Sequence, residues 1–192
     1  MELEKEITVQ IETDYENLHN ILTGKGFATK DIYQLNDIYM IDKNVNIKNL
    51  DKLEVLKKCI LVRDLVGIRK ELLYKYKKYN EDGEILEQGK VKCPILDIDK
   101  AVSFMKHINY VKLFEINDKC IEYINDKTEL LVQLVNNKYI FIEMEDKQQY
   151  GDKVYNNTLE MIEEFDSYNL TYKKGNYFVK KAEMMLDEVL DK

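Results

Sequence analysis

The property that most constrains this chain is a strict alternation of apolar and polar residues in segments separated by few helical stretches. The first such segment, "ELEKEITVQI", puts Glu2, Glu4 and Glu6 on one face of a strand, because successive side chains of a strand point to opposite faces. Its other face carries mostly Leu, Ile and Val. Three like charges in a row repel each other unless water screens them or a cation lies among them. This strand therefore has either a hydrated acidic face or a cation-binding face.

The same kind of alternation recurs along the chain in segments that hairpins connect. Strands are expected at 31–41, 57–66, 112–124, 129–135 and 138–146, with a hairpin over 69–95 around Asp82 and Gly83. Helices are expected after the capping box of Thr13 and Glu16, after Asp97 or Asp99, around 159–165 and over 178–189. A parallel sheet would need a helix between most strands. The pattern therefore predicts an antiparallel sheet or barrel with helices packed outside.

Length and composition favour one globular domain over residues 1–192. The chain is long enough to bury a substantial core, and 45% of its residues are hydrophobic. One proline, few glycines and the lack of a low-complexity linker give no sign of a domain boundary. The net charge of −7 disfavours nucleic-acid binding driven by overall charge, so no nucleic-acid partner is expected.

The cysteines and the hydropathy pattern indicate a reducing compartment. Cys59, Cys93 and Cys120 are widely spaced and form no C-x-x-C pair, so we expect free thiols in the core or in strands. His19 and His107 lie far from any cysteine, which disfavours a zinc site. The chain has no N-terminal apolar segment and no apolar run of about 18 residues. We therefore expect a cytoplasmic protein with no membrane partner.

Several strands carry paired charges on the face opposite their apolar residues. Glu143 and Glu145 share one face of their strand. The paired bases are Lys75 with Lys77 and Lys90 with Lys92, and single bases are Arg63 and Lys119. If the apolar faces point outward, the interior of a closed barrel is lined with carboxylates and cations. Mg²⁺ prefers carboxylate and phosphate oxygens, and Lys and Arg bind phosphates, so this lining indicates a metal–polyphosphate site.

An alternative explanation of the same pattern needs no ligand. Charged residues at alternate positions are common on the hydrated face of a half-buried antiparallel sheet. Each pair alone is compatible with that explanation. Its recurrence in four strands is what favours a binding site.

The order of several short motifs resembles the CYTH superfamily, also called triphosphate tunnel metalloenzymes, over nearly the whole chain. Glu4-x-Glu6-x-Thr8 is similar to the family's E-x-E-x-K signature. "GFATKDIYQLNDIY" resembles its GF and Q-x-D-x-Y landmarks, "ILVR" its "LRIR", and "LLYKYK" its "LTYK". "NDKCIEY" resembles K-x-R-x-x-Y, "FIEME" resembles "FVEIE", and "GNYFVKK" resembles the closing segment near Tyr177.

The resemblance implies an α+β fold, an antiparallel eight-stranded β-barrel that encloses a tunnel, with helices packed outside. It also implies Mg²⁺ or Mn²⁺ as cofactor and a small-molecule polyphosphate or nucleotide as ligand. The metal ligands would be Glu4, Glu6, Glu143 and Glu145, of which Glu4 and Glu6 are also the candidate catalytic residues. The phosphate-binding residues would be Arg63, Lys75, Lys77, Lys90, Lys92 and Lys119.

Departures from the family pattern keep more than one function open. Thr8 stands in place of the signature lysine, and Leu61 and Ile121 stand in place of two arginines. Metal-dependent hydrolysis of tripolyphosphate or of a nucleoside triphosphate is the first reading. A barrel that binds phosphates without cleaving them is the second, and a structural domain filled with salt bridges is the third. Adenylate cyclase of class IV ranks below hydrolysis because no residue selects adenine. Monomer and homodimer both stay open.

Overall fold

The computed structural model describes residues 5–79, 85–146 and 148–190, with the backbone alone for 77–79 and 85–88. The strands in this part of the chain are β1 (Glu6–Ile11), β2 (Ala28–Asp42), β3 (Ile60–Leu65), β4 (Arg69–Tyr79), β5 (Ile85–Pro94), β6 (Tyr110–Ile124), β7 (Glu129–Val135) and β8 (Tyr139–Glu145). The helices are α1 (Tyr15–Gly24), α2 (Lys52–Lys57), α3 (Ile98–His107), α4 (Thr158–Ser167) and α5 (Lys181–Leu190). A short 3₁₀ helix spans Ile47–Asn49.

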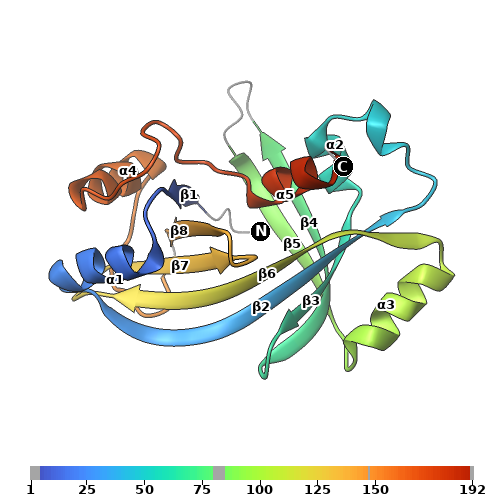
Figure 1. The fold of residues 1–192 in the computed structure, drawn as a ribbon, viewed down its shortest axis with the longest axis horizontal. Coiled ribbons are helices and arrows are strands. Elements are labelled where there is room, and N and C mark those ends of the chain that lie inside the picture. The colour runs from blue at the N-terminus through green and yellow to red at the C-terminus, as the bar shows by residue number, and fades with distance from the viewer. Residues whose placement is uncertain (1–4, 80–84, 147, 191–192) are drawn as a thin grey trace. The chain divides into compact units, whose positions relative to one another are not determined.

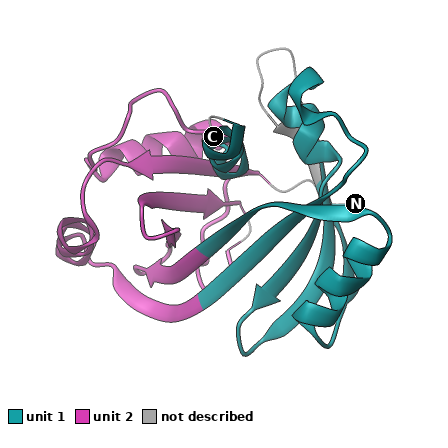
Figure 2. Ribbon diagram, turned by 45° about the vertical axis from the view of Figure 1, so that its right-hand side comes forward, with its two compact units in different colours: residues 1, 34–117, 180–192 teal, residues 2–33, 118–179 magenta. Residues whose placement is uncertain are grey.

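The eight strands form one sheet in the order β1-β8-β7-β6-β2-β3-β4-β5 (Figure 1). The strand pairs whose register is described are antiparallel. The predicted α+β fold with eight antiparallel strands is therefore confirmed. The chain divides into two compact units (Figure 2): unit 1 holds residues 1, 34–117 and 180–192, and unit 2 holds residues 2–33 and 118–179.

The core of unit 2 lies between one face of its strands and the helices α1 and α4. The strand residues of this core include Ile7, Val9, Ile142 and Met144, which alternate with the polar residues of β1 and β8. Leu18 and Leu22 of α1 and Met161 and Phe165 of α4 are fully buried against the same cluster. Burying an aliphatic or aromatic side chain of this size contributes about 1.5–3 kcal/mol. The apolar half of the alternation thus fixes which strand face is left for polar residues.

The free edge of β1 in unit 2 is paired with the segment that precedes α5. Thr8 donates its backbone N–H to the Tyr177 carbonyl, and the Val179 N–H donates to the Thr8 carbonyl, both at 2.9 Å. An isolated antiparallel bridge joins Ile11 to Tyr172. These contacts hold β1 from both sides, since β8 pairs with its other edge.

In unit 1 both faces of the sheet are covered. Met40 and Val62 pack against Met105 of α3 on one face. Leu61 and Leu73, which alternation places on the opposite face, are also buried. The helices α2 and α5 of this unit are joined by the ion pair of Lys52 with Asp187, at 2.7 Å.

Several expectations for the helices are corrected by the structure. The N-cap of α1 is Asp14, which accepts from the Asn17 N–H at 2.9 Å, so the predicted capping box of Thr13 and Glu16 is wrong. The Asp97 cap of α3 is confirmed. The predicted strand at 57–66 begins only at Ile60, because α2 occupies Lys52–Lys57.

Two further expectations concern the ends of elements. The predicted turn at Asp82 and Gly83 lies outside the described residues. The C-terminal helix begins at Lys181, since the segment before it pairs with β1.

None of the described helices is long and apolar enough to cross a membrane.

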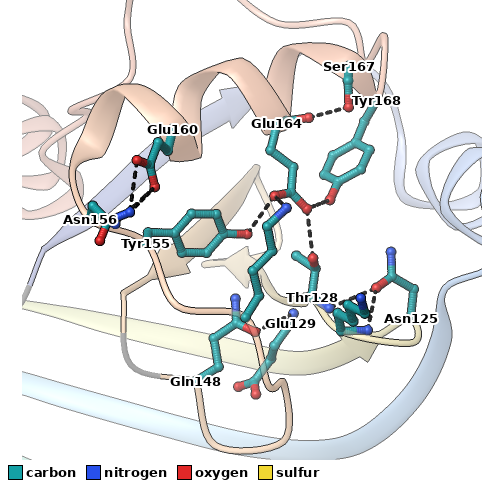
Figure 3. A network of polar contacts seen from close by, with 12 residues as sticks. Asn125, Thr128, Glu129, Gln148, Tyr155, Asn156, Glu160, Glu164, Ser167 and Tyr168 are labelled. Atoms are coloured by element: carbon teal, nitrogen blue, oxygen red, sulfur yellow. Dashed lines mark hydrogen bonds and ion pairs between the residues drawn. The ribbon is translucent and has the colours of Figure 1, made fainter.

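A half-buried carboxylate attaches α4 to the β6–β7 turn (Figure 3). Glu164 accepts hydrogen bonds from Thr128 Oγ1 and the Tyr168 hydroxyl at 2.6 Å and from the Tyr155 hydroxyl at 2.9 Å, and it forms an ion pair with Lys153. Burial disfavours the charged form of Glu164, but these donors outweigh it and lower its pKa. The carboxylate therefore remains ionised and fully hydrogen-bonded.

We predict that Glu164→Ala destabilises the protein by about 3 kcal/mol, because it leaves several buried hydroxyls without their acceptor. Urea unfolding followed by circular dichroism measures this loss. The matched control is Glu163→Ala, one residue earlier on the exposed side of α4, which should change stability by less than about 0.5 kcal/mol. Equal effects of the two substitutions would contradict the assignment.

Candidate functional site

Three carboxylates converge on the polar face of β1 and β8 in unit 2. Glu6 lies directly opposite Glu145 in the strand pair, and Thr8 lies opposite Glu143. One carboxylate oxygen from each of Glu6, Glu143 and Glu145 lies within 4.8 Å of the other two, and all three residues are half-buried. The neighbouring residues Ile7 and Met144 face the core instead. Register and alternation therefore bring these acids together.

This donor set fits a hard divalent cation. Mg²⁺ and similar ions bind carboxylate oxygens and keep positions for water or substrate phosphates. Three carboxylates so close together repel each other, and a cation between them would relieve that repulsion. Among the predicted metal ligands, the structure thus brings Glu6, Glu143 and Glu145 together, while Glu4 lies outside the described residues.

A fourth acid of unit 2, Glu122 on β6, is almost completely buried. One of its oxygens accepts a hydrogen bond from the Tyr33 hydroxyl at 3.0 Å. Its other oxygen, Oε2, is buried and has no hydrogen-bond partner among the residues that the structure describes. Burial first, and then the charges of Glu129 and Glu143, raise the pKa of Glu122 to about 7. This carboxyl therefore holds a proton over much of the range in which surface acids are ionised.

In unit 1, Arg63 and Asp37 form a bidentate pair across β2 and β3. Arg63 Nε donates to Asp37 Oδ1 at 2.7 Å, and a terminal guanidinium nitrogen donates to Oδ2 at 2.6 Å. Both side chains are buried, with 14% and 7% exposed. Burial opposes the charge of Asp37, but Arg63 and the charges of Lys75 and Lys181 outweigh it, so the pKa of Asp37 is lowered. The predicted phosphate-binding Arg63 is therefore held by a carboxylate of its own chain.

A second buried acid of unit 1 lies next to this pair. Glu71 on β4 is opposite Arg63 on β3, so Asp37, Arg63 and Glu71 form a row across three strands. Glu71 Oε2 lies 3.6 Å from Arg69 Nε. The other oxygen, Oε1, is buried and accepts no hydrogen bond from the described part of the chain.

The predicted phosphate-binding lysines lie on three strands, β4, β5 and β6. Lys75 and Lys90 are opposite each other on β4 and β5, and Lys92 is opposite Leu73. Lys77 lies on β4, but its side chain lies outside the described residues. Lys119 is exposed and alternates with Glu122 on β6, so it lies on the other face of the sheet from that acid.

Sequence reasoning overlooked four residues of these clusters. They are Glu71, Glu122, Glu129 and Lys181. The alternation of β4 puts Glu71 on the same strand face as Lys75, and that of β6 puts Glu122 on the same face as Cys120. This signal was available in the sequence. Nothing in the sequence indicates that Lys181 contributes to the surroundings of Asp37, because α5 is far away along the chain.

Comparison with known proteins gives a fold but no family. No family model matches the chain, and no curated protein matches its sequence. The PH1012 protein from Pyrococcus horikoshii OT3 is similar in structure, with a TM-score of 0.65, 13% identity and coverage of 95% of this chain and 99% of the other.

Two further solved structures carry functional names. HpAC1 from Hippeastrum, an adenylyl cyclase candidate with a dominant triphosphatase activity, has a TM-score of 0.61 and 11% identity, over 97% of this chain and 96% of its own. An adenylate cyclase candidate from Vibrio parahaemolyticus has a TM-score of 0.59 and 11% identity, over 100% of this chain and 99% of its own. At such identities these likenesses show a shared fold alone. That fold occurs in proteins named for adenylate cyclase and triphosphatase chemistry.

We predict that Asp37→Asn costs about 3–5 kcal/mol of stability, because it leaves the buried Arg63 charge without its counterion. Denaturant unfolding measures the loss. The double variant Asp37→Leu with Arg63→Met should recover most of it, since replacing both members of a buried pair by apolar residues is often neutral. If the unfolding free energy of Asp37→Asn were within about 0.5 kcal/mol of that of the wild type, the pairing would be contradicted.

With cations removed by a chelator, Glu122→Gln should stabilise the protein at pH 8 and have little effect on its stability at pH 5. The unfolded chain ionises Glu122 near its ordinary pKa of 4.5, whereas the folded protein keeps the proton up to about pH 7. Wild-type stability therefore falls between those values, and the glutamine variant lacks this loss. The expected gain at pH 8 is roughly 3 kcal/mol. Thermal melts across this range test it, and parallel pH profiles of the two proteins would contradict it.

Proposed function

We propose that this chain is a CYTH-like protein that hydrolyses a triphosphate-containing substrate, either inorganic tripolyphosphate or a nucleoside triphosphate, with Mg²⁺ or Mn²⁺. The observation that carries the proposal is the convergence of Glu6, Glu143 and Glu145 on one strand face. The shared fold with an adenylyl cyclase candidate of dominant triphosphatase activity supports it. We also propose that residues 1–192 act as one domain, because β2 and β6 each contribute to both units.

The proposed metal ligands are Glu6, Glu143 and Glu145 in unit 2, together with Glu4. A divalent cation bound there would neutralise phosphate oxygens and lower the pKa of a bound water. The carboxylates would hold the cation on a strand pair whose orientation is set by the burial of the neighbours Ile7 and Met144 in the core. Glu4 and Glu6 are the proposed catalytic residues, with the task of orienting the attacking water.

The proposed phosphate-binding residues are the bases of unit 1. They are Arg63, Lys75, Lys77, Lys90 and Lys92. Asp37 holds the Arg63 guanidinium in one orientation, which preserves its direction but neutralises much of its charge. Ammonium groups act as point charges without the fork of arginine, so the lysines would supply most of the charge for phosphates. Lys119 is left out because it lies on the opposite sheet face from Glu122.

A phosphate-binding protein without turnover is the second candidate. The observation that favours it is the loss of cationic groups: Thr8, Leu61 and Ile121 replace family cations, and Arg63 is occupied by Asp37. Weak stabilisation of the charge on a transferring phosphoryl group lowers the rate more than it lowers binding. Adenylate cyclase chemistry ranks third, because no described contact selects adenine.

Glu145→Gln separates these functions. If the chain is a hydrolase, phosphate release from tripolyphosphate or ATP should require Mg²⁺ or Mn²⁺ and should fall at least about 100-fold in this variant. The control Glu163→Gln carries the same change on an exposed residue of α4 and should keep full activity.

Thermal melts with the same substrates distinguish the other outcomes. A ligand that binds only the folded state raises the melting temperature. Stabilisation by tripolyphosphate and metal without phosphate release would assign the chain as a binding protein. Pyrophosphate release from ATP with formation of a cyclic nucleotide would assign a cyclase. If the substrates neither stabilise the protein nor release phosphate, the phosphate proposal is ruled out.

A further inference from the structure

β5 of unit 1 is the last strand of the described sheet, and β4 pairs with one of its two sides. A strand that is covered on one face shows alternate buried and exposed residues. Residues 90–94 of β5 are all exposed instead, and Val91 is exposed to 62%. Both faces of this stretch are therefore accessible, together with the side that points away from β4. We call this side, over residues 90–94, the outer edge of β5.

The strand register shows which residues direct their backbone groups to the outer edge. The Ile95 N–H donates to the Lys70 carbonyl at 3.0 Å, and this contact continues the regular register of β4 with β5. In an antiparallel pair, residues that exchange hydrogen bonds alternate with residues whose N–H and C=O point the other way. Counted back from Ile95, Cys93 and Val91 therefore direct these groups to β4. Lys92 lies between them and directs its N–H and C=O outward.

Pro94 supports this assignment of directions. It lies two residues after Lys92 in β5, so its backbone nitrogen points to the same outer edge. Proline has no N–H to donate to a neighbouring strand, and within sheets it is confined largely to edge strands with the nitrogen turned outward. An edge with an outward N–H and C=O, such as those of Lys92, is a template for pairing with another extended chain.

The side chains around the outer edge define the chemistry of a strand that fits it. Lys90 and Lys92 share one face of β5, and Lys75 of β4 lies opposite Lys90 on that face. The other face is apolar here, because Val91 lies opposite Tyr74, which is 41% exposed. A strand that matches both faces alternates acidic with apolar residues. A second copy of β5 fits poorly, because antiparallel pairing centred on this stretch would place lysines opposite lysines.

We propose that the outer edge of β5 binds an extended segment of another protein, in which acidic residues alternate with apolar ones, as an added antiparallel strand. One acid of the segment lies opposite Lys92 and exchanges both backbone hydrogen bonds with it. The acids of the segment face Lys90 and Lys92, and its apolar residues contact Val91. The proposed function assigns these lysine side chains to phosphate but makes no use of the backbone groups of the outer edge, and segment binding needs no hydrolysis.

The test uses the full-length chain and short labelled peptides with blocked ends, in which glutamate alternates with valine. Fluorescence anisotropy at low salt measures their affinity, because salt screens exposed charges. A glutamate opposite Lys92 directs its amide to β5, whereas the valine amides point away. N-methylation of the glutamate amides should therefore weaken binding at least about tenfold. N-methylation of the valine amides is the matched control and should change the affinity less than about threefold.

Two variants of one residue separate the backbone contact from charge. Lys92→Pro removes the outward N–H together with the ammonium group and should abolish measurable binding, while the hydrogen bonds that Val91 and Cys93 direct to β4 are kept. Lys92→Gln removes the charge alone and should weaken binding no more than about fivefold. Circular dichroism checks that both variants fold. In the free protein, the Lys92 amide should exchange with solvent faster than the amides of Val91 and Cys93, and the peptide should protect it.

Four outcomes would overturn the proposal. The first is that the peptide does not bind. The second is that the two methylation patterns weaken binding equally, which would leave only a contact between charges. The third is that binding survives Lys92→Pro. The fourth is self-association of the chain that Lys92→Pro removes, which would assign the outer edge to a second copy. Metal-dependent phosphate release tests the proposed function separately, so failure of either proposal leaves the other intact.

Discussion

Repulsion between neighbouring carboxylates is the constraint on which the account of unit 2 depends. The apolar residues of β1 and β8 must face the core, so alternation forces Glu6, Glu143 and Glu145 onto the opposite face. Glu122 and Glu129 join that face from β6 and β7. The fold therefore gathers several acids on one strand face of unit 2. A cation bound among Glu6, Glu143 and Glu145 would balance part of this charge, and the raised pKa of Glu122 favours its protonated form.

In unit 1, buried charges of opposite sign are paired with each other. Asp37 and Arg63 neutralise each other through two short hydrogen bonds, so a buried cation is stabilised without a ligand. The nearby bases on β4 and β5 are lysines, which bind anions through charge more than through directed hydrogen bonds. An arginine fixed by its own chain is well oriented but has little charge left for a phosphate. This difference is the physical reason for considering binding without rapid turnover.

Sequence alone predicted the features that depend on local alternation. The antiparallel sheet follows from period-two patterns. Alternation also gave the face on which each of Glu6, Glu143 and Glu145 lies, but their grouping was implied by the family resemblance, because the pairing of β1 with β8 is not visible in the sequence. The pair of Asp37 with Arg63 could not be derived this way, because it depends on the register between two strands. The position of Glu122 near Glu143 also depends on strand register, because Leu131 lies opposite both residues. Lys119 was assigned by motif, whereas its parity relative to Glu122 places it on the other face.

The helices show the same limit. Asp14 and Thr13 are both good capping residues, and only the backbone geometry selects Asp14. α2 has six residues and lies directly before β3, and the predicted strand began at Lys57, which is the last residue of this helix. The segment before α5 pairs with the edge of β1 through the Tyr177 carbonyl and the Val179 N–H. Each of these differences arises where tertiary contacts decide between two locally acceptable structures.

Binding of a divalent cation among these three carboxylates is tested by anomalous diffraction from crystals of the full chain soaked with Mn²⁺. We expect an anomalous peak at roughly 2.1 Å from carboxylate oxygens of Glu6, Glu143 and Glu145, as for a small hard cation. A well-ordered map in which these three carboxylates point apart, or in which a lysine ammonium occupies the space between them, would contradict it.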